Sequence, residues 1–494
     1  MDDIVLRTFL LQFDGALFDQ LWVDPSNPFA VWAASSSGGV LDYLGLAEGR
    51  GLSVDHRNWL GAADTPFVFS AMDMVDTNRD SILLLPNART GGVSLQTETN
   101  TGELVSGGLL TDLQNRPLTL SRIAMADTGE ERLFVATPPN GSSLHLYRLD
   151  DTYQQASLLD TVTDTAKSTL SNVSDILTLT LGNTEFVIAA SSVENGISAY
   201  SLSGSSLELT DTLGPKDGLW INGMEDIAAL SAGGQGFVIG VSSASGTLSA
   251  IRINPMGALF LTDIILDDQT TRFGGAVALD TFQANDRNFI VTGGTDGGIA
   301  LFELLPRGQL LHHQSIAQSN GWDVGNILSI QAVVTGSEVQ IILGGSEALG
   351  LVQLVLPLSN LGLLTEGTGQ PDTLSGAAND DLLMGLWGND QITGNAGADT
   401  LIAGPGQDTL TGGAGADVFM FTADGQTDTI NDFQLGQDQI NLDDWGMIYD
   451  ISALTIQARS WGAILSWRNE VIHVHSDDGV PLAPDSWSID DFLF

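Results

Sequence analysis

Hydrophobic residues in the first three quarters of the chain occur in short β-type runs that are separated by glycine-rich turns. Residues 186–190 form one such run, and residues 197–200 form the next after the turn at Asn195-Gly196. This order of run, turn and run recurs along the chain at intervals of 53, 51, 53, 51, 51 and 52 residues. The first apolar residues after each turn are Val40, Val93, Leu144, Ile197, Leu248, Ile299 and Leu351.

A repeat of about 50 residues that is rich in Val, Ile, Leu and Thr has the length of one four-stranded propeller blade. In the fourth repeat we expect the strands at 176–181, 186–190, 197–202 and 207–213. The repeats therefore predict a seven-bladed β-propeller over residues 1–366, with a β-sandwich or β-solenoid as the alternative. Ring closure needs a strand from the other end of the ring, and residues 4–11 and 361–365 compete for that place.

A second repeat, nine residues long, begins at Gly367 and occurs six times up to Met420. Its sixth position is always aspartate and its eighth position is always apolar. The aspartates are Asp372, Asp381, Asp390, Asp399, Asp408 and Asp417, and the apolar residues are Leu374, Leu383, Ile392, Leu401, Leu410 and Phe419. A nonapeptide of this form builds a parallel β-helix in which two repeats make one coil and the turns bind Ca²⁺.

Calcium takes roughly six to eight oxygen ligands, which carboxylates and backbone carbonyls can supply. Glycines allow the backbone to turn and direct its carbonyls inward, and the aspartate adds negative charge. Stacked turns come from repeats n and n+2, so six repeats offer four pairings and we expect about four Ca²⁺ ions. The expected calcium-binding residues are Gly367, Gly369, Asp372, Gly376, Asn379, Asp381, Gly385, Gly388, Asp390, Gly394, Gly397, Asp399, Gly404, Gly406, Asp408, Gly413, Gly415 and Asp417.

Residues 367–420 resemble the RTX (repeats-in-toxin) family, whose members leave the cell through type I secretion systems. The resemblance implies a calcium-binding β-roll, an extracellular location and the type I secretion machinery as a partner. It extends more loosely to the chain end, so residues 421–494 are expected to form a β-rich cap that carries the C-terminal secretion signal. Gln370 and Asn379 replace the fourth-position glycine and Ala403 opens the fifth repeat, so we expect the first coil to bind calcium weakly.

The charge balance excludes several partners. Seventeen Lys and Arg residues stand against 61 Asp and Glu, a net charge of −44, which repels nucleic acid and anionic membranes. Cysteine is absent, so a metal must be held by oxygen or imidazole. Residues 1–7 lack the pattern of a secretory signal peptide, and there is no apolar run long enough for a transmembrane helix.

The sequence lacks the motifs of two enzyme classes, the metalloproteases and the lipases. None of the six histidines is followed by glutamate, which excludes an H-E-x-x-H metalloprotease, and the nearest approach to the lipase motif G-x-S-x-G, at 344–348, lacks its last glycine. His473 and His475 would share one face of a strand, and His312 and His313 would lie on opposite faces of an outer strand. We expect the first pair to have a structural or surface role and the second pair to lie at the surface.

Loops that lead into the inner strands of a propeller crowd one face of the ring around its central channel. An acid, an amide and an indole in these loops could together bind a metal or a sugar, although solvated loop residues are the favoured interpretation. The candidates are Trp220, Asn222, Glu225, Asp226, Arg272, Trp322, Asp323 and Asn326.

The sequence thus predicts an all-β, secreted calcium-binding protein. A propeller (1–366) would recognise an extracellular glycan or protein, and an RTX β-roll (367–420) with its cap (421–494) would fold with calcium and serve export. The alternative is a secreted propeller enzyme, such as a lactonase, another hydrolase or a lyase, with a channel metal held by Glu225 and Asp226. Three or more acid or amide groups converging on one point would favour the enzyme, and a channel filled with apolar side chains would favour binding.

Overall fold

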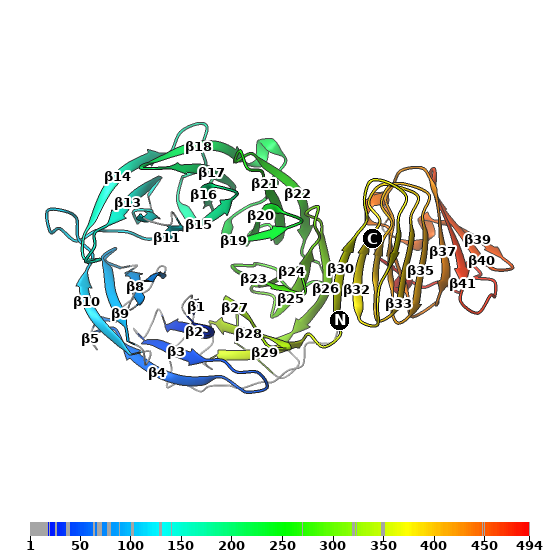
Figure 1. The fold of residues 1–494 in the computed structure, drawn as a ribbon, viewed down its shortest axis with the longest axis horizontal. Helices are drawn as coiled ribbons and strands as arrows, with labels where there is room; N and C mark the ends of the chain where they lie inside the picture. The colour runs from blue at the N-terminus through cyan, green and yellow to red at the C-terminus, as the bar shows by residue number, and fades with distance from the viewer. Residues whose placement is uncertain are drawn as a thin grey trace. The chain divides into compact units, whose positions relative to one another are not determined.

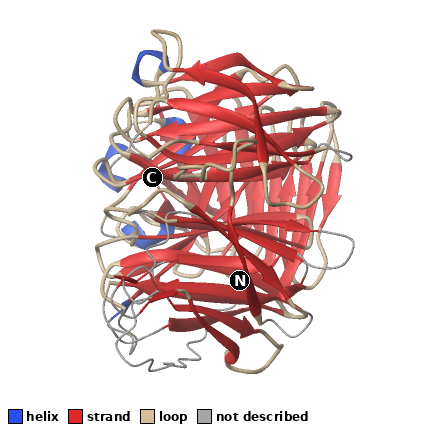
Figure 2. Cartoon of the chain, turned by 90° about the vertical axis from the view of Figure 1, so that its left-hand side faces the viewer, coloured by secondary structure: helices blue, strands red, loops and turns tan. Residues whose placement is uncertain are grey.

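The computed structural model describes most of the chain, and its described residues fall into two compact units. The first unit ends at Pro357, and the second comprises the residues from Leu358 onward together with Asn285–Arg287. The described residues are 18, 20–24, 27–35, 40–62, 65–66, 72–76, 81–87, 89–99, 103–127, 131–139, 141–268, 270–318, 322, 324–346, 351–446, 448 and 450–493. Strands dominate both units (Figure 2), and no helix in this part of the chain is long and apolar enough to cross a membrane.

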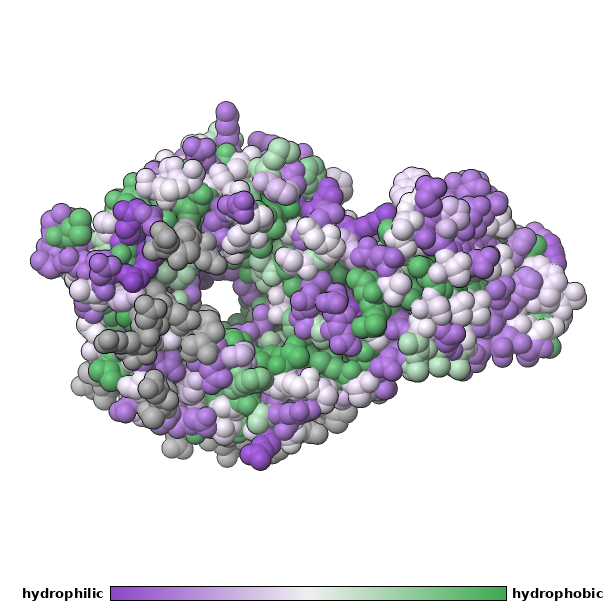
Figure 3. Space-filling model, in the orientation of Figure 1, coloured by the Kyte–Doolittle hydropathy of each residue, from purple (hydrophilic) through white to green (hydrophobic). Residues whose placement is uncertain are grey.

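Seven antiparallel sheets form the first unit and surround a central hole (Figures 1 and 3), which confirms the seven-bladed β-propeller. From the inside outward, the first blade contains β1 (Gln20–Asp24), β2 (Asn27–Ser35), β3 (Val40–Gly45) and β4 (Ser53–Trp59), the second contains β7 (Asp73–Asp76), β8 (Ser81–Pro86), β9 (Val93–Glu98) and β10 (Leu104–Leu109), and the third contains β11 (Ile123–Asp127), β12 (Arg132–Ala136), β13 (Ser143–Leu149) and β14 (Ala156–Thr163). The fourth contains β15 (Val173–Leu181), β16 (Thr184–Ser191), β17 (Gly196–Ser203) and β18 (Ser206–Leu213), and the fifth contains β19 (Met224–Ala232), β20 (Gln235–Ser242), β21 (Thr247–Ile253) and β22 (Leu259–Leu266). The sixth contains β23 (Ala278–Ala284), β24 (Arg287–Gly293), β25 (Gly298–Leu304) and β26 (Leu310–Ala317), and the seventh contains β27 (Ile327–Thr335), β28 (Glu338–Gly345) and β29 (Leu351–Pro357). A short hairpin of β5 (Gly61–Ala62) and β6 (Thr65–Pro66) follows the first blade.

The middle strands have continuous apolar runs because both of their faces are buried. Successive side chains of a strand point to opposite faces. In β16, Val187 and Ala189 pack with residues of the third blade, whereas Phe186, Ile188 and Ala190 pack with residues of the fifth. The four strands expected in the fourth repeat lie within β15 to β18.

The ring closes where the first blade meets the seventh. Their innermost strands, β1 and β27, are in contact. The backbone N–H of Leu52 donates to Oε1 of Gln353 at 3.2 Å, and that of Gly49 donates to Oε1 of Glu338 at 2.8 Å. Of the two segments proposed to close the ring, residues 4–11 lie outside the described residues.

The proposal for residues 361–365 is wrong. They lie in β30 (Leu361–Glu366), which pairs in parallel with β32 (Asp380–Met384) in the second unit. A parallel partner in the roll satisfies the backbone groups that an outer blade strand would have offered to β29.

Two sheets of mostly parallel strands form the second unit, as expected for a β-roll. The first contains β30, β32, β34 (Thr400–Ile402), β36 (Val418–Met420), β38 (Gln439–Asn441) and β42 (Phe492–Leu493). The second contains β31 (Thr373–Ser375), β33 (Gln391–Ala396), β35 (Thr409–Ala414), β37 (Thr427–Phe433), β41 (Glu470–Ser476), β40 (Gly462–Trp467) and β39 (Thr455–Arg459). All six eighth-position apolar residues lie in one buried core, at 9% exposure for Leu374 and 0% for the others.

The segment after residue 420 continues both sheets. Strand β37 pairs in parallel with β35 and with β41, and β38 pairs in parallel with β36 and with β42. Trp445, Trp487 and Phe492 are buried in the same core as the nonapeptide residues. The described residues after 420 are therefore part of the folded roll.

Candidate calcium sites in the roll and candidate sites of the propeller

The sixth-position aspartates form two hydrogen-bonded ladders, one along each edge of the roll. In each step a backbone N–H donates to Oδ1 of an aspartate one coil further on. On one edge the N–H groups of Asp372, Asp390 and Asp408 donate to Asp390 (2.8 Å), Asp408 (2.8 Å) and Asp428 (2.9 Å). On the other edge those of Asp381, Asp399 and Asp417 donate to Asp399 (2.8 Å), Asp417 (2.9 Å) and Asp438 (3.1 Å).

The second carboxylate oxygen of four of these residues is buried without a hydrogen-bond partner among the described residues. These atoms are Oδ2 of Asp390, Asp399, Asp408 and Asp417, whose side chains are each 1% exposed. A buried carboxylate oxygen without a partner is costly unless a cation lies beside it. Burial, with a smaller contribution from neighbouring carboxylates, raises the pKa of Asp399 and Asp408 to about 7 and that of Asp417 to about 6.

Backbone carbonyls gather between the stacked turns. A Cβ atom added to Gly406 would lie 1.5 Å from the carbonyl oxygen of Gly388, and one added to Gly415 would lie 1.7 Å from that of Gly397. The fourth-position glycines of repeats three to six have φ between 121° and 156°. Because L side chains rarely adopt this backbone conformation, only glycine lets one turn approach the carbonyls of the turn before it.

The first two repeats close their turns differently. Oδ2 of Asp372 accepts hydrogen bonds from the N–H and the hydroxyl of Thr368, at 2.6 and 2.9 Å. Oδ2 of Asp381 accepts one from the N–H of Ala377 at 2.5 Å. Gln370 and Asn379 do not have the positive φ of the later fourth positions. These two carboxylates are therefore already satisfied by their own turns.

The ladder extends two aspartates beyond the nonapeptide register. Asp428 and Asp438 are buried, and burial raises the pKa of each to about 7. They follow the previous aspartates of their edges by 20 and 21 residues rather than 18, so a search in strict nines misses them. The signal that could have found them is an aspartate two residues before a buried isoleucine, Ile430 or Ile440.

A calcium site in this roll cannot consist of side chains alone. In the described ranges, no group of three or more His, Asp or Glu side chains could hold a metal ion. Each stacked pair of turns instead offers a carboxylate oxygen together with several backbone carbonyls, which are hard ligands suited to Ca²⁺. The residues present therefore fit calcium, and Oδ2 of Asp390, Asp399, Asp408 and Asp417 are the carboxylate oxygens that have no hydrogen-bond partner among the described residues.

The channel of the propeller contains a cavity of about 610 Å³, lined by the innermost strands. Several acids line it: Asp73, Asp175, Glu225, Asp226 and Asp280.

Four of these acids hold neighbouring blades together. Oδ2 of Asp73, Asp175, Asp226 and Asp280 accepts the backbone N–H of Met125 (2.6 Å), Ile227 (3.2 Å), Leu279 (3.0 Å) and Ala332 (2.7 Å), each in the next blade. Burial raises the pKa of Asp73 to about 6 and that of Asp280 to about 7. Asp175 and Asp226 share a hydrogen bond between their carboxyl groups, and burial raises the pKa of both. Sequence reasoning missed this role, although the 51-residue spacing of Asp175 and Asp226 matches the blade repeat.

The loop candidates do not come together in the channel. Glu225 and Asp226 line the cavity, whereas Trp220, Asn222, Arg272, Trp322 and Asn326 are not among its lining residues. The two indoles differ sharply, since Trp220 is 78% exposed and Trp322 is 1% exposed. Asp323 lies outside the described residues.

His312 and His313 lie on the outer strand β26, as expected, but both are only partly exposed because they pack against the blade. Nε2 of His313 lies 2.8 Å from Oε2 of the buried Glu303, and its ring packs on Phe289. The ring of His312 packs on Phe302, and burial lowers its pKa. The acid was missed because Glu303 lies on the neighbouring strand β25.

His473 and His475 lie on one face of β41, as expected. Both rings pack on Trp461, with centroid distances of 5.8 and 4.3 Å. This stacking fits a structural role.

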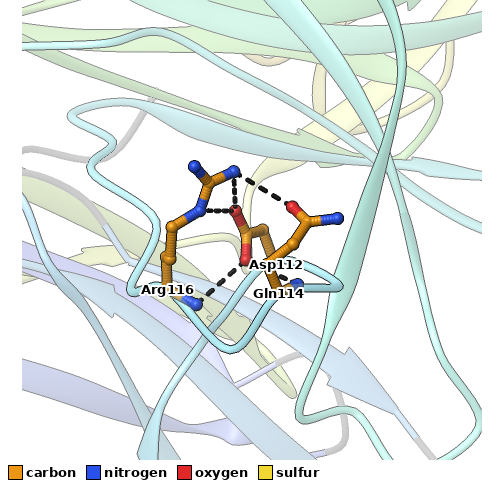
Figure 4. Close-up of polar contacts among 3 residues, drawn as sticks. All are labelled: Asp112, Gln114 and Arg116. Atoms are coloured by element: carbon orange, nitrogen blue, oxygen red, sulfur yellow. Dashed lines mark hydrogen bonds and ion pairs between the residues drawn. The ribbon is translucent and has the colours of Figure 1, made fainter.

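The loop between β10 and β11 contains a partly exposed acid, Asp112, that is used within its own turn (Figure 4). The carboxylate of Asp112 accepts the backbone N–H groups of Gln114 (2.8 Å) and Arg116 (2.9 Å) and the Nε–H of Arg116 (2.7 Å). These donors, led by the backbone N–H of Arg116, lower the pKa of Asp112. The acid therefore fixes a turn.

Comparison with known proteins identifies the roll. Residues 366–392 and 393–425 match the model of the RTX calcium-binding nonapeptide repeat. No curated protein matches the chain.

Similar solved structures include the hydrazine synthase of Kuenenia stuttgartiensis, with 9% identity, a TM-score of 0.49 and coverage of 72% of this chain and 99% of that one. A protein from Lactobacillus plantarum has 14% identity, a TM-score of 0.40 and coverage of 55% and 79%. A functionally unknown protein from Desulfotomaculum acetoxidans has 14% identity, a TM-score of 0.41 and coverage of 62% and 87%.

Proposed function

We propose that this chain is a secreted protein whose β-roll folds around calcium outside the cell, and whose propeller acts as a recognition platform. The calcium part of this proposal is supported by four buried Oδ2 atoms that lie beside stacked carbonyls and have no hydrogen-bond partner among the described residues. About four Ca²⁺ ions would be held by these aspartates together with the glycine-rich turns of repeats three to six and the turns stacked on them.

The carboxylates make the folding of the roll depend on the calcium concentration of the compartment. Without calcium, buried aspartates of one edge oppose folding through desolvation and mutual repulsion. The glycine-rich turns also lose much chain entropy when they are ordered. Calcium that binds only the folded form, at 100 times its dissociation constant, adds about 2.7 kcal/mol per site. A calcium-poor cytosol would thus keep the segment unfolded for type I export, and external calcium would fold it.

The enzyme alternative receives less support from the channel. Four acids of the channel already accept backbone N–H groups of the next blade. These contacts between blades explain why the acids are buried, and no metal is needed for that explanation. Glu225 also hydrogen bonds with Ser243 at 3.1 Å. A structural use of the channel acids leaves the propeller surfaces as the place for recognition.

Export is tested by deleting residues 490–494 and measuring secretion through a co-expressed type I exporter. We expect secretion to fall several-fold while the propeller stays folded. Phe492→Ala is the matched control, because it removes a buried side chain of β42 but keeps the chain end. Secretion of the deletion variant at the parent level, or an equal loss in both variants, contradicts an export signal at the C-terminus.

A further inference from the structure

A second cavity lies on the propeller, between the loop that joins β14 to β15 and the loop that joins β18 to β19. Its volume is about 570 Å³, within the range of small-molecule sites. Lys167 on the first loop and Lys216 on the second both line it. These two residues are the only lysines in the 494-residue chain. A protein with a net charge of −44 therefore has both of its lysines in the lining of one cavity.

Both ammonium groups are available to a ligand. Lys167 and Lys216 are exposed, and neither side chain has a hydrogen bond or ion pair with a described residue. The two acids that line the cavity are held by backbone donors. Oε2 of Glu194 accepts the N–H of Ser171 at 2.9 Å, and Oδ2 of Asp217 accepts that of Gly214 at 3.2 Å.

Hydroxyl groups hold the wall of the cavity in place. The hydroxyl of Thr212, on β18, donates to the carbonyl of Lys167 at 2.8 Å and so ties the first loop to the blade. Thr169 and Ser198 hydrogen bond through their hydroxyls at 2.9 Å. The loop that carries Lys216 also carries Trp220, whose side chain is 78% exposed. The surroundings combine two exposed lysines, hydroxyl groups and an exposed indole on a neighbouring stretch of the same loop.

We propose that this cavity binds a short acidic saccharide, a sugar that bears a carboxylate or a sulfate group. Two ammonium groups suit the anionic substituent, and the hydroxyl-rich wall suits the sugar's own hydroxyls. The inference rests on the proposed recognition role of the propeller and gives that role a ligand class. Long polyanions are repelled by the net charge, but the Debye length of about 8 Å at physiological salt lets the lysine pair act on a small ligand.

Calorimetric titration of the calcium-loaded full chain in 0.15 M salt tests this site. The probes are an oligouronate, a sulfated oligosaccharide, a neutral oligosaccharide of equal length and inorganic phosphate. We expect at least one anionic oligosaccharide to bind about ten-fold or more tightly than the neutral one, because a hydrogen bond to a charged group is stronger than one between neutral groups. No binding of either anionic oligosaccharide at millimolar concentration, or equal binding of phosphate, overturns the proposal.

Two double variants separate the site from the overall charge. Lys167→Gln with Lys216→Gln should weaken binding of the anionic oligosaccharide about ten-fold or more. Arg50→Gln with Arg307→Gln is the control, because it removes the same charge from exposed residues outside the cavity. An equal loss in both variants overturns the site. A calcium titration of the roll on the same samples tells failure of this inference apart from failure of the calcium proposal.

Discussion

The backbone N–H of Asp381 donates to Oδ1 of Asp399, one coil further along the roll, at 2.8 Å. The same carboxylate leaves Oδ2 buried without a partner among the described residues. We propose that each such aspartate has two separate uses, because Oδ1 accepts the N–H of the neighbouring coil and Oδ2 can bind the cation. The proposed division accounts for aspartate, with its two equivalent oxygens, at positions 390, 399, 408 and 417.

Replacing Asp399 and Asp408 together by Asn should raise the calcium concentration needed to fold the roll by about ten-fold or more, since it removes a charged ligand on each edge. The amide oxygen can still accept the N–H of the neighbouring coil, so the ladder is kept. A calcium titration followed by circular dichroism measures the midpoint. Asp372→Asn is the control, because Thr368 already satisfies its Oδ2. The same midpoint in the double variant and the parent would show that these carboxylates are not ligands.

Gly406→Ala should destabilise the calcium-loaded roll by more than about 3 kcal/mol, because the backbone has φ of 156° and the new Cβ would lie 1.5 Å from the carbonyl oxygen of Gly388. Gly369→Ala is the matched control, since its Cβ would meet no atom within 4 Å. Its effect should stay within about 1 kcal/mol. Chemical denaturation at fixed calcium gives both values, and similar losses in the two variants would refute the close stacking of turns.

The buried channel acids should make the propeller less stable as pH rises. A carboxyl group whose pKa is raised on folding binds its proton more tightly in the folded state. Its ordinary pKa is about 3.9, and the folded pKa is about 6 for Asp73 and about 7 for Asp280. The free energy of unfolding should therefore fall between about pH 4 and pH 7, by up to about 1.4 kcal/mol per pH unit for each group, and level off above.

Asp280→Asn should reduce that slope, because the amide can accept the N–H of Ala332 and carries no proton to lose. Glu208→Gln is the control, since it removes an exposed carboxylate of β18. Urea unfolding at several pH values, read from propeller peptides by hydrogen exchange, measures the slope. Stability that rises with pH, or an unchanged slope in Asp280→Asn, contradicts the burial of a neutral carboxyl group.

Periodic features of the fold could be predicted from the sequence. The blade repeat is visible because residues 186–190 in the middle of β16 are buried on both faces of the sheet and are all apolar. The roll is visible because every nonapeptide has an aspartate at its sixth position, such as Asp399, and an apolar residue at its eighth, such as Leu401. In both cases each unit meets the same neighbours, so the same residue types recur.

Pairings across the chain could not be predicted in this way. Asp428 and Asp438 continue the ladder after insertions that shift the register. The carboxylate of Asp226 accepts the backbone N–H of Leu279 in the next blade. Leu279 lies 53 residues further along the chain, and no local pattern indicates this pairing. The sequence of residues 361–365 is compatible with an outer blade strand and with a strand of the roll. The parallel pairing with β32 shows that these residues form a strand of the roll.

Hydrogen exchange of the full chain, compared in EDTA, millimolar Ca²⁺ and millimolar Mg²⁺, tests the central claim most directly. Magnesium demands a compact octahedron that carbonyl-rich turns do not readily offer. Calcium should protect the amides of residues 372–440 from exchange, including the ladder N–H groups of Asp381 and Asp399. Magnesium should give little protection. Peptides of the propeller core, such as 184–203, should exchange at the same rate in all three conditions. Equal exchange of residues 372–440 in calcium and EDTA, or equal protection by magnesium, would contradict a roll that folds around calcium.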